Sequence, residues 1–392
     1  MTATASRSPS NAFFAAAIAI GIEGALIIWM VPGFMALFAG QAHLTDSQLG
    51  YLASWEINAM AVTIGVSTFL LTRVDWRHLV GLGLALICIG NITTAFSHDY
   101  MPLLLSRVIV GSGEGIAVGL SFAALGRAEN PDRMFAIYLV VGAVVSSLLL
   151  LILPDLQDAF GAPAVFGGNA VLCALVVISL RWFADGRLPA GFTSTHGVPI
   201  HWRLAIGGLV GAFLYFLAQG ETWSYVERIG QVHHVATSQI AWALAAANLS
   251  GVAGAALAGV LPRHWGRIWP LLVSGCVSIV SFQMLIVDIS ALGLIVAAVA
   301  MTFAWNFAQP LISGLCSEAD REGRVVVAMG SIQTVGFGFG PALAASILYE
   351  QDFSPVIWSA SALIAVSLMV MSVGILTSQS VVSAVPLEEH GL

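Results

Sequence analysis

The sequence predicts an all-α integral membrane protein with twelve transmembrane helices in two pseudo-symmetric six-helix halves. The 392 residues are 58% hydrophobic and only 9% charged, and their mean hydropathy is +0.91. Soluble chains carry about 25% charged residues, so this chain lacks enough polar surface to face water on all sides. Long apolar stretches recur along the whole chain, and short motifs return after about 190 residues.

The apolar stretches define the expected helices in order. A helix that crosses the hydrocarbon core of about 30 Å needs about 20 mostly apolar residues. Twelve stretches between polar, proline or glycine breaks reach that length: 12–36, 47–71, 79–97, 102–126, 134–153, 162–182, 204–226, 238–261, 268–287, 291–316, 325–349 and 354–377. A membrane barrel would instead show alternating segments of about ten residues. The first stretch is too long for a cleaved signal peptide, so we expect it to be the first span.

The composition also excludes several functional classes. All 14 basic residues are arginines and the net charge is −7, so no basic stripe for nucleic acid is predicted. Without lysine the chain has no phosphate-binding loop of the G-x-x-x-x-G-K type, which excludes an ATP-driven pump. The four cysteines lie far apart in apolar stretches, without metal-ligand spacing. We expect no metal and no other cofactor.

The arginines predict the orientation in the membrane. With the N-terminus in the cytoplasm, twelve of the 14 arginines fall on the cytoplasmic side, whereas the outer loops hold acids such as Asp99 and Asp155. The Ala-, Gly- and Arg-rich composition suggests a GC-rich bacterial genome. We therefore expect a multi-pass protein of the bacterial cytoplasmic (inner) membrane with both termini in the cytoplasm.

Internal repeats predict the two halves. The segment Ser-Gln-Leu-Gly-Tyr at 47–51 returns as Ser-Gln-Ile-Ala-Trp at 238–242. Two arginines of the following loop, Arg73 and Arg77, return as Arg263 and Arg267. The expected organisation is an N-terminal half at 1–182, a cytoplasmic linker at 183–203, a C-terminal half at 204–377 and a cytoplasmic tail at 378–392.

Six plus six helices, a central cytoplasmic loop and a repeated arginine-containing loop resemble the major facilitator superfamily over essentially the whole chain. The most specific match is Arg107-Val-Ile-Val-Gly111-Ser-Gly113-Glu114-Gly115, which is similar to the family's R-x-x-x-G-x-G pattern. Its Gly-Glu pair looks like the spinster-type branch. The resemblance implies alternating access of the two halves, with helices 1, 4, 7 and 10 around a central cavity.

The arginine-containing loops depart from the family pattern G-x-L-A-D-R-x-G-R. Arg73 and Arg263 stand where that pattern has its Asp. We therefore expect the charge lock between the halves to be absent or rebuilt. The resemblance assigns Arg73, Arg77, Arg263 and Arg267 to gating.

Ionisable residues inside the spans are functional candidates, because a charge in the membrane interior is costly. Five lie well inside: Glu23, Glu56, Arg107, Glu114 and Glu221. We predict that Glu23, Glu114 and Glu221 couple transport to protons, that Arg107 and Glu114 face the cavity, and that Glu56 belongs to the gate. Arg107 and Glu114 share one helix face about two turns apart. We expect Arg107 to pair with a glutamate in one access state, with Glu114 or one on the first helix as the favoured partner, and to face water or solute in the other state. A purely structural ion network or packing role stays open for each of the five.

Other polar and aromatic residues are expected to line the cavity. The sequence offers Gln219 and Trp223 beside Glu221, and Trp305, Asn306 and Gln309 before Pro310. Pro310 removes one backbone hydrogen bond and creates a polar turn in an apolar helix, which fits either a substrate-binding turn or a simple kink.

Together these features predict a secondary active transporter of a small organic solute, a monomer in the lipid bilayer that works by alternating access as a proton-coupled symporter or antiporter. Three cavity glutamates against one arginine favour protons and cationic or amphipathic solutes. Two alternatives stay open: a transporter-like solute sensor, and an exporter of lipids or amphipathic compounds within the same fold. An enzyme is not expected, because the sequence shows no metal cluster or nucleophile–base constellation at mid-depth.

Overall fold

The chain folds into helices grouped in two compact units. The computed structural model describes residues 11–42, 44–70, 73–182, 200–261, 265–287, 289–320, 324–349 and 351–383. The units are Met1–Thr193 and Ser194–Leu392. Apart from one isolated bridge between Tyr349 and Asp352, the described residues form helices, turns and irregular segments. The predicted all-α class is confirmed.

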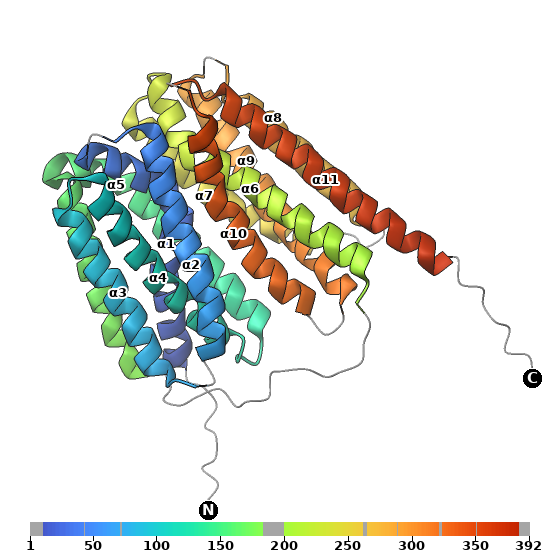
Figure 1. Ribbon diagram of the computed structural model, residues 1–392, viewed down its shortest axis with the longest axis horizontal. Coiled ribbons are helices and arrows are strands. Elements are labelled where there is room, and N and C mark those ends of the chain that lie inside the picture. The colour runs from blue at the N-terminus through green and yellow to red at the C-terminus, as the bar shows by residue number, and fades with distance from the viewer. Residues whose placement is uncertain are drawn as a thin grey trace, which may run out of the picture. The chain divides into compact units, whose positions relative to one another are not determined.

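The N-terminal unit is built around α4. Its helices are α1 (Asn11–Gln41), α2 (Asp46–Leu70), α3 (Trp76–Phe96), α4 (Tyr100–Leu125) and α5 (Pro131–Val177), followed by the short 3-10 helix η1 (Ile178–Trp182). Helix α4 packs against α1, α2 and α3, and α5 packs against α1 and α3 (Figure 1). Because α4 touches three neighbours, polar side chains on it can meet partners from several helices.

The C-terminal unit repeats this pattern. Its helices are α6 (Trp202–Val232), α7 (Thr237–Gly259), α8 (Ile268–Gln283), α9 (Ala291–Ala319), α10 (Arg324–Ile347) and α11 (Ser354–Ser383). Helix α9 packs against α6, α7 and α8, as α4 packs against α1, α2 and α3. Helix α6 packs against α10 and α11, and Figure 1 shows α11 running alongside it. Both units therefore use one packing scheme, as expected for a duplicated chain.

The helices match the predicted spans with one correction. The break expected between the spans at 134–153 and 162–182 lies at Gly161, whose φ of 78° is non-helical, so that α5 consists of two helices that meet at a kink, and the second continues into η1. Helix α8 has only 16 residues and ends before the predicted boundary at 287. Among the described residues, nine helices are long and apolar enough to cross a membrane. Proline and glycine both count as breaks between apolar stretches, but Pro154 and Pro163 lie within helical segments of α5 and do not end them.

Local side chains explain where several helices begin. The Asp75 carboxylate accepts a hydrogen bond from the Arg77 N–H at the start of α3, and the Asn130 side chain caps α5 in the same way. The Ser290 hydroxyl accepts a bond from the Gly293 N–H at the start of α9. Each satisfies a backbone donor that the first helical turn leaves free.

Glycines let α4 approach α2 closely. A Cβ atom at Gly111 would lie 2.1 Å from the Glu56 carbonyl oxygen, and one at Gly115 would lie 2.2 Å from the Met60 carbonyl oxygen. Residues four apart share one helix face, so these glycines form one contact ridge against α2. This contact brings Glu56 of α2 beside α4, near Arg107.

Candidate functional site

Arg107 is the centre of a buried polar cluster in the N-terminal unit. Its side chain is 1% exposed, and its Nη2 atom lies 3.2 Å from Oε1 of Glu56, which is 2% exposed. Unpaired, either charge would be costly to bury, whereas a hydrogen-bonded pair recovers much of that cost. The ion pair therefore joins α4 to α2 inside the unit.

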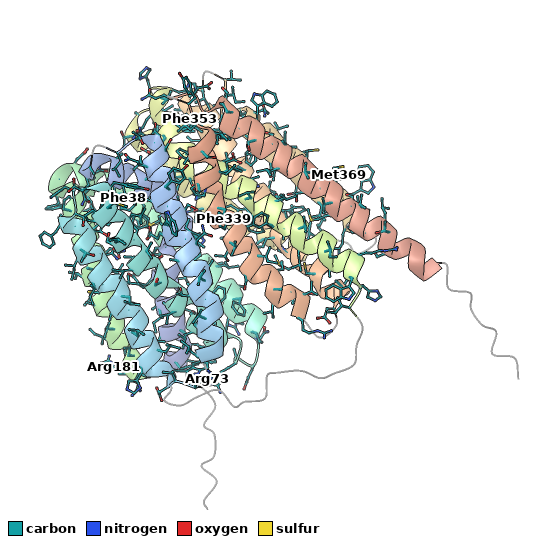
Figure 2. The ribbon with its side chains drawn as sticks, in the orientation of Figure 1. Phe38, Arg73, Arg181, Phe339, Phe353 and Met369 are labelled. Carbon is teal, nitrogen blue, oxygen red and sulfur yellow. The ribbon has the colours of Figure 1, made fainter. Side chains whose placement is uncertain are left out.

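Two phenylalanine rings flank the guanidinium. The Arg107 Cζ atom lies 5.6 Å from the ring centroid of Phe38 in α1 and 5.6 Å from that of Phe166 in α5. The two rings stack on each other with centroids 5.2 Å apart. Arginine over aromatic faces gains a cation–π attraction that strengthens where water is excluded. Figure 2 shows Phe38 towards one end of this unit and Arg73 and Arg181 at the opposite end.

Asn91 of α3 completes the surroundings of Arg107. Its Oδ1 atom accepts hydrogen bonds from both terminal nitrogens of the guanidinium, each at 3.4 Å. Its Nδ2 atom donates to Oδ1 of Asn169 in α5 at 2.8 Å. The cluster thus draws one side chain from each of α1, α2 and α3, two from α5 and Arg107 from α4.

Arg107 pairs with a glutamate, as expected for one access state, but not with either of the two favoured ones. We expected Glu114 or a carboxylate of the first helix, and the ion pair is instead made with Glu56 of α2. The seven-residue spacing places Arg107 and Glu114 on one face, but it carries no information about which neighbouring helix reaches the guanidinium. The close α2–α4 contact at Gly111 decides this, because it brings Glu56 to Arg107.

Glu23 and Glu114 lie nearby without an ion-pair partner among the described residues. Glu23 is 4% exposed and Glu114 is 5% exposed. The backbones meet where a Cβ atom at Gly24 would lie 2.8 Å from the Glu114 carbonyl oxygen. Glu114 lies within electrostatic range of Glu23, Glu56 and Arg107. The unit therefore holds three buried carboxyl groups for one buried guanidinium.

Glu221 occupies a comparable place in the C-terminal unit. It is fully buried on α6. Among the described residues neither carboxylate oxygen has a hydrogen-bond partner of standard geometry, although the Ser359 hydroxyl of α11 is close enough for a polar interaction. Helix α10 crosses directly behind it, because a Cβ atom at Gly340 would lie 2.3 Å from the Glu221 backbone nitrogen. This close crossing buries Glu221 between helices.

The other expected cavity residues fall into two groups. Gln219 is fully buried and donates from Nε2 to the Ser278 hydroxyl at 3.3 Å, and the Tyr215 hydroxyl bonds Ser278 and Ser274. Trp223 is also buried. These side chains join α6 to α8 inside the unit.

The predicted residues of α9 lie on a partly buried face. Trp305 stacks on Phe337 with ring centroids 5.1 Å apart. Asn306 donates to the Thr302 carbonyl oxygen at 2.9 Å, and Gln309 is partly buried. Helix α9 continues through Pro310. The local hydrogen bond of Asn306 fits a kinked helix as well as a binding turn.

The arginines predicted to gate are distributed over both units. Arg73 is exposed, and Arg77 donates its backbone N–H to Asp75. Arg267 bonds Glu318 of α9, with its Nη2 atom 2.5 Å from Oε1. Arg263 lies outside the described residues.

Sequence reasoning missed Asn91, Asn169, Phe38 and Phe166. The signal that could have found Asn91 is a polar side chain in the middle of an apolar helix, where it is 2% exposed. The two phenylalanines carry no signal, because the chain has 20 of them. In the part of the chain that the structure describes, no group of three or more His, Cys, Asp or Glu side chains could hold a metal ion.

Comparison with known proteins identifies the family. Residues 12–345 match the model of the Major Facilitator Superfamily. The chain is 26% identical to a "Multidrug resistance protein B homolog" of Mycobacterium tuberculosis (strain CDC 1551 / Oshkosh) over 162 residues, 41% of this chain and 26% of that protein. It is 25% identical to the "Minor myo-inositol transporter IolF" of Bacillus subtilis (strain 168) over 186 residues, 45% of this chain and 40% of that protein. The alignments thus cover less than half of either relative.

The family consists of transporters rather than enzymes, and its members cross the membrane several times. The match covers most of the chain and both units, and it agrees with the apolar helices and with the repeated packing of α4 and α9. The chain belongs to the Major Facilitator Superfamily.

Proposed function

We propose that this protein is a secondary active transporter of a small organic solute, driven by the proton gradient and working by alternating access of its two units. The observation that carries the proposal is the surplus of buried carboxyl groups. Arg107 is engaged by Glu56, which leaves Glu23 and Glu114 in the N-terminal unit and Glu221 in the C-terminal unit without an ion-pair partner among the described residues.

Burying a carboxylate without a cation beside it costs several kcal/mol of folding free energy. A bound proton or a cationic solute removes that cost. Such a carboxyl group holds a proton or a cation while the membrane interior surrounds it. It can release the proton when the site opens to water. This behaviour supports proton coupling. It also favours cationic or amphipathic solutes over anions, since the only arginine that the sequence places inside a span is already paired.

The similarity to a multidrug resistance protein homologue supports a second candidate within the same fold, an exporter of amphipathic compounds. The two functions differ in direction and not in the site. Transport into inside-out vesicles with an acidic lumen supports export, and uptake into right-side-out vesicles with acidic surroundings supports import.

The arginine distribution supports an orientation with both ends of the chain in the cytoplasm of a bacterial cell. Arg73 and Arg181 are exposed at the same end of the N-terminal unit (Figure 2). This end is proposed to face the cytoplasm, and the opposite end, near Phe38, the outside.

The decisive experiment is gradient-driven accumulation in proteoliposomes. A thermal-shift screen first selects a solute that stabilises the purified protein. We expect Glu23→Gln and Glu221→Gln to abolish accumulation driven by a pH gradient, while exchange of the solute at equal pH persists. The control is Glu227→Gln on α6, a buried carboxylate that accepts a hydrogen bond from Gln231. Proton coupling through these groups is refuted if both variants still concentrate the solute.

A further inference from the structure

Two buried carboxyl groups, those of Glu56 and Glu114, compete for Arg107 in the N-terminal unit. Arg107 attracts both Glu56 and Glu114, and Glu23 lies within range of Glu114. Glu114 is two turns from Arg107 on the same helix, within reach of a long side chain that bends. Attraction alone therefore does not determine which carboxylate the guanidinium neutralises.

The contacts of its two terminal nitrogens hold the Arg107 guanidinium in place. Both donate to Oδ1 of Asn91, and Nη2 also meets Glu56. Arginine has only donors, so the amide oxygen of Asn91 must face it and the amide nitrogen must face away. That nitrogen donates to Asn169 of α5, which holds the amide in this orientation.

In this arrangement the two terminal nitrogens of the guanidinium contact Glu56 of α2 and Asn91 of α3. The remaining edge carries Nε, which has no hydrogen-bond partner among the described residues. No hydrogen bond or ion pair between Arg107 and Glu114 is present in the described part of the chain. Asn91 therefore adds two hydrogen bonds that favour the Glu56 side over the Glu114 side.

We propose that Asn91 is a positioning residue that holds Arg107 on Glu56 and thereby keeps Glu114 free to take a proton or a cationic solute. The inference rests on the proposed function, since it explains why one carboxyl group is neutralised and its neighbour is not. Without the amide, the guanidinium would redistribute towards Glu114, and Glu56 would lose its cation.

The test measures which carboxyl group is neutral, without using transport. Dicyclohexylcarbodiimide is apolar and reacts with protonated carboxyl groups, and the modified residues are identified by mass spectrometry. The purified full-length chain in lipid nanodiscs is labelled as wild type and as Asn91→Leu, Asn91→Ser and Asn91→Asp. The matched control is Asn58→Leu on α2, where the amide nitrogen donates to the backbone carbonyl and hydroxyl of Ser54.

We expect wild type and Asn58→Leu to react at Glu114 and hardly at Glu56. Asn91→Leu should reverse this pattern, with a several-fold loss of labelling at Glu114 and a several-fold gain at Glu56. Asn91→Ser, whose hydroxyl is too short to reach the guanidinium, gives the same comparison if the leucine variant does not fold. Asn91→Asp keeps an acceptor that holds the guanidinium on α3 and should restore labelling at Glu114, while Glu56 is labelled as well because the new carboxylate shares its cation.

A merely structural amide would lower the folded yield and leave the ratio of the two labels unchanged. An unchanged ratio in folded Asn91→Ser or Asn91→Leu overturns the proposal, as does an equal change in Asn58→Leu. Failure of proton coupling is a separate outcome, read from the Glu23→Gln and Glu221→Gln transport assays. The labels report the partner of Arg107 even if transport uses another energy source.

Discussion

The contact between α2 and α4 at Gly111 predicts a large effect from a single methyl group. In Gly111→Ala the new Cβ atom would lie 2.1 Å from the Glu56 carbonyl oxygen, and real Cβ contacts begin near 3.0 Å. The two helices must therefore separate by about 1 Å. The obstacle is backbone, so a side-chain rotation cannot relieve it. The same movement draws Glu56 away from Arg107, whose ion pair measures 3.2 Å and would stretch towards the 4.0 Å limit of such a pair.

The magnitude follows from three effects on the free energy of unfolding. Overpacking a filled contact costs about 1–3 kcal/mol. Alanine gains up to ~1 kcal/mol in helix propensity over glycine. Weakening a buried ion pair adds part of the ~3–5 kcal/mol that a full break would cost. We expect a net destabilisation of about 2–4 kcal/mol.

The assay is the midpoint of thermal unfolding of the purified protein in detergent. The matched control is Gly65→Ala on α2, where no atom lies within 4 Å of the added Cβ. Only the propensity gain acts there, so the control should be stabilised by up to ~1 kcal/mol. The two substitutions should therefore shift the midpoint in opposite directions. A Gly111→Ala variant that melts at or above the wild-type temperature would refute the close contact.

The remaining predictions concern the start of α11 and the orientation in the membrane. Hydrogen bonds from Ser354 to the Asp352 carboxylate lower its pKa below the ordinary value of about 3.9, so this cap stabilises α11 above that pH and is lost as the pH falls further. Amide protection at the start of α11 should drop below about pH 4 in the wild type, and Asp352→Asn should show little pH dependence there. For orientation, a cysteine replacing Asp155 should react with an impermeant maleimide in intact cells, and one placed in the 186–198 segment only after the cytoplasmic side is opened. The reverse labelling pattern would contradict the proposed orientation.

The amino-acid sequence alone was sufficient for the class of the protein and for most helix positions. Apolar length decides whether a segment can cross a membrane, and that quantity is local in sequence. Caps such as Asp75 and Asn130 are local as well, because they act within three residues. The burial of Glu23, Glu114 and Glu221 was also predictable, since they lie in the middle of apolar stretches.

The fold of α5 shows how far local signals reach. Pro154, Gly161 and Pro163 predict a break between two spans, and the helix does break at Gly161, whereas neither proline ends a helix. Whether a proline ends a helix or only bends it depends on what packs against the freed backbone groups. That information lies in neighbouring helices and not in the segment itself.

The partners inside the site were decided only by the tertiary structure. Helical spacing placed Arg107 and Glu114 on one face, but the guanidinium meets Glu56 and Asn91, which lie 51 and 16 residues away along the chain. In the sequence, the motif glycines match a family pattern. In the fold, the missing side chain of Gly111 lets α2 approach α4. A sequence fixes which face of a helix carries a charge. Which helix packs against that face, and at what height, depends on contacts summed over the whole unit. The choice between Glu56 and Glu114 as the partner of Arg107 therefore exists only in the folded chain.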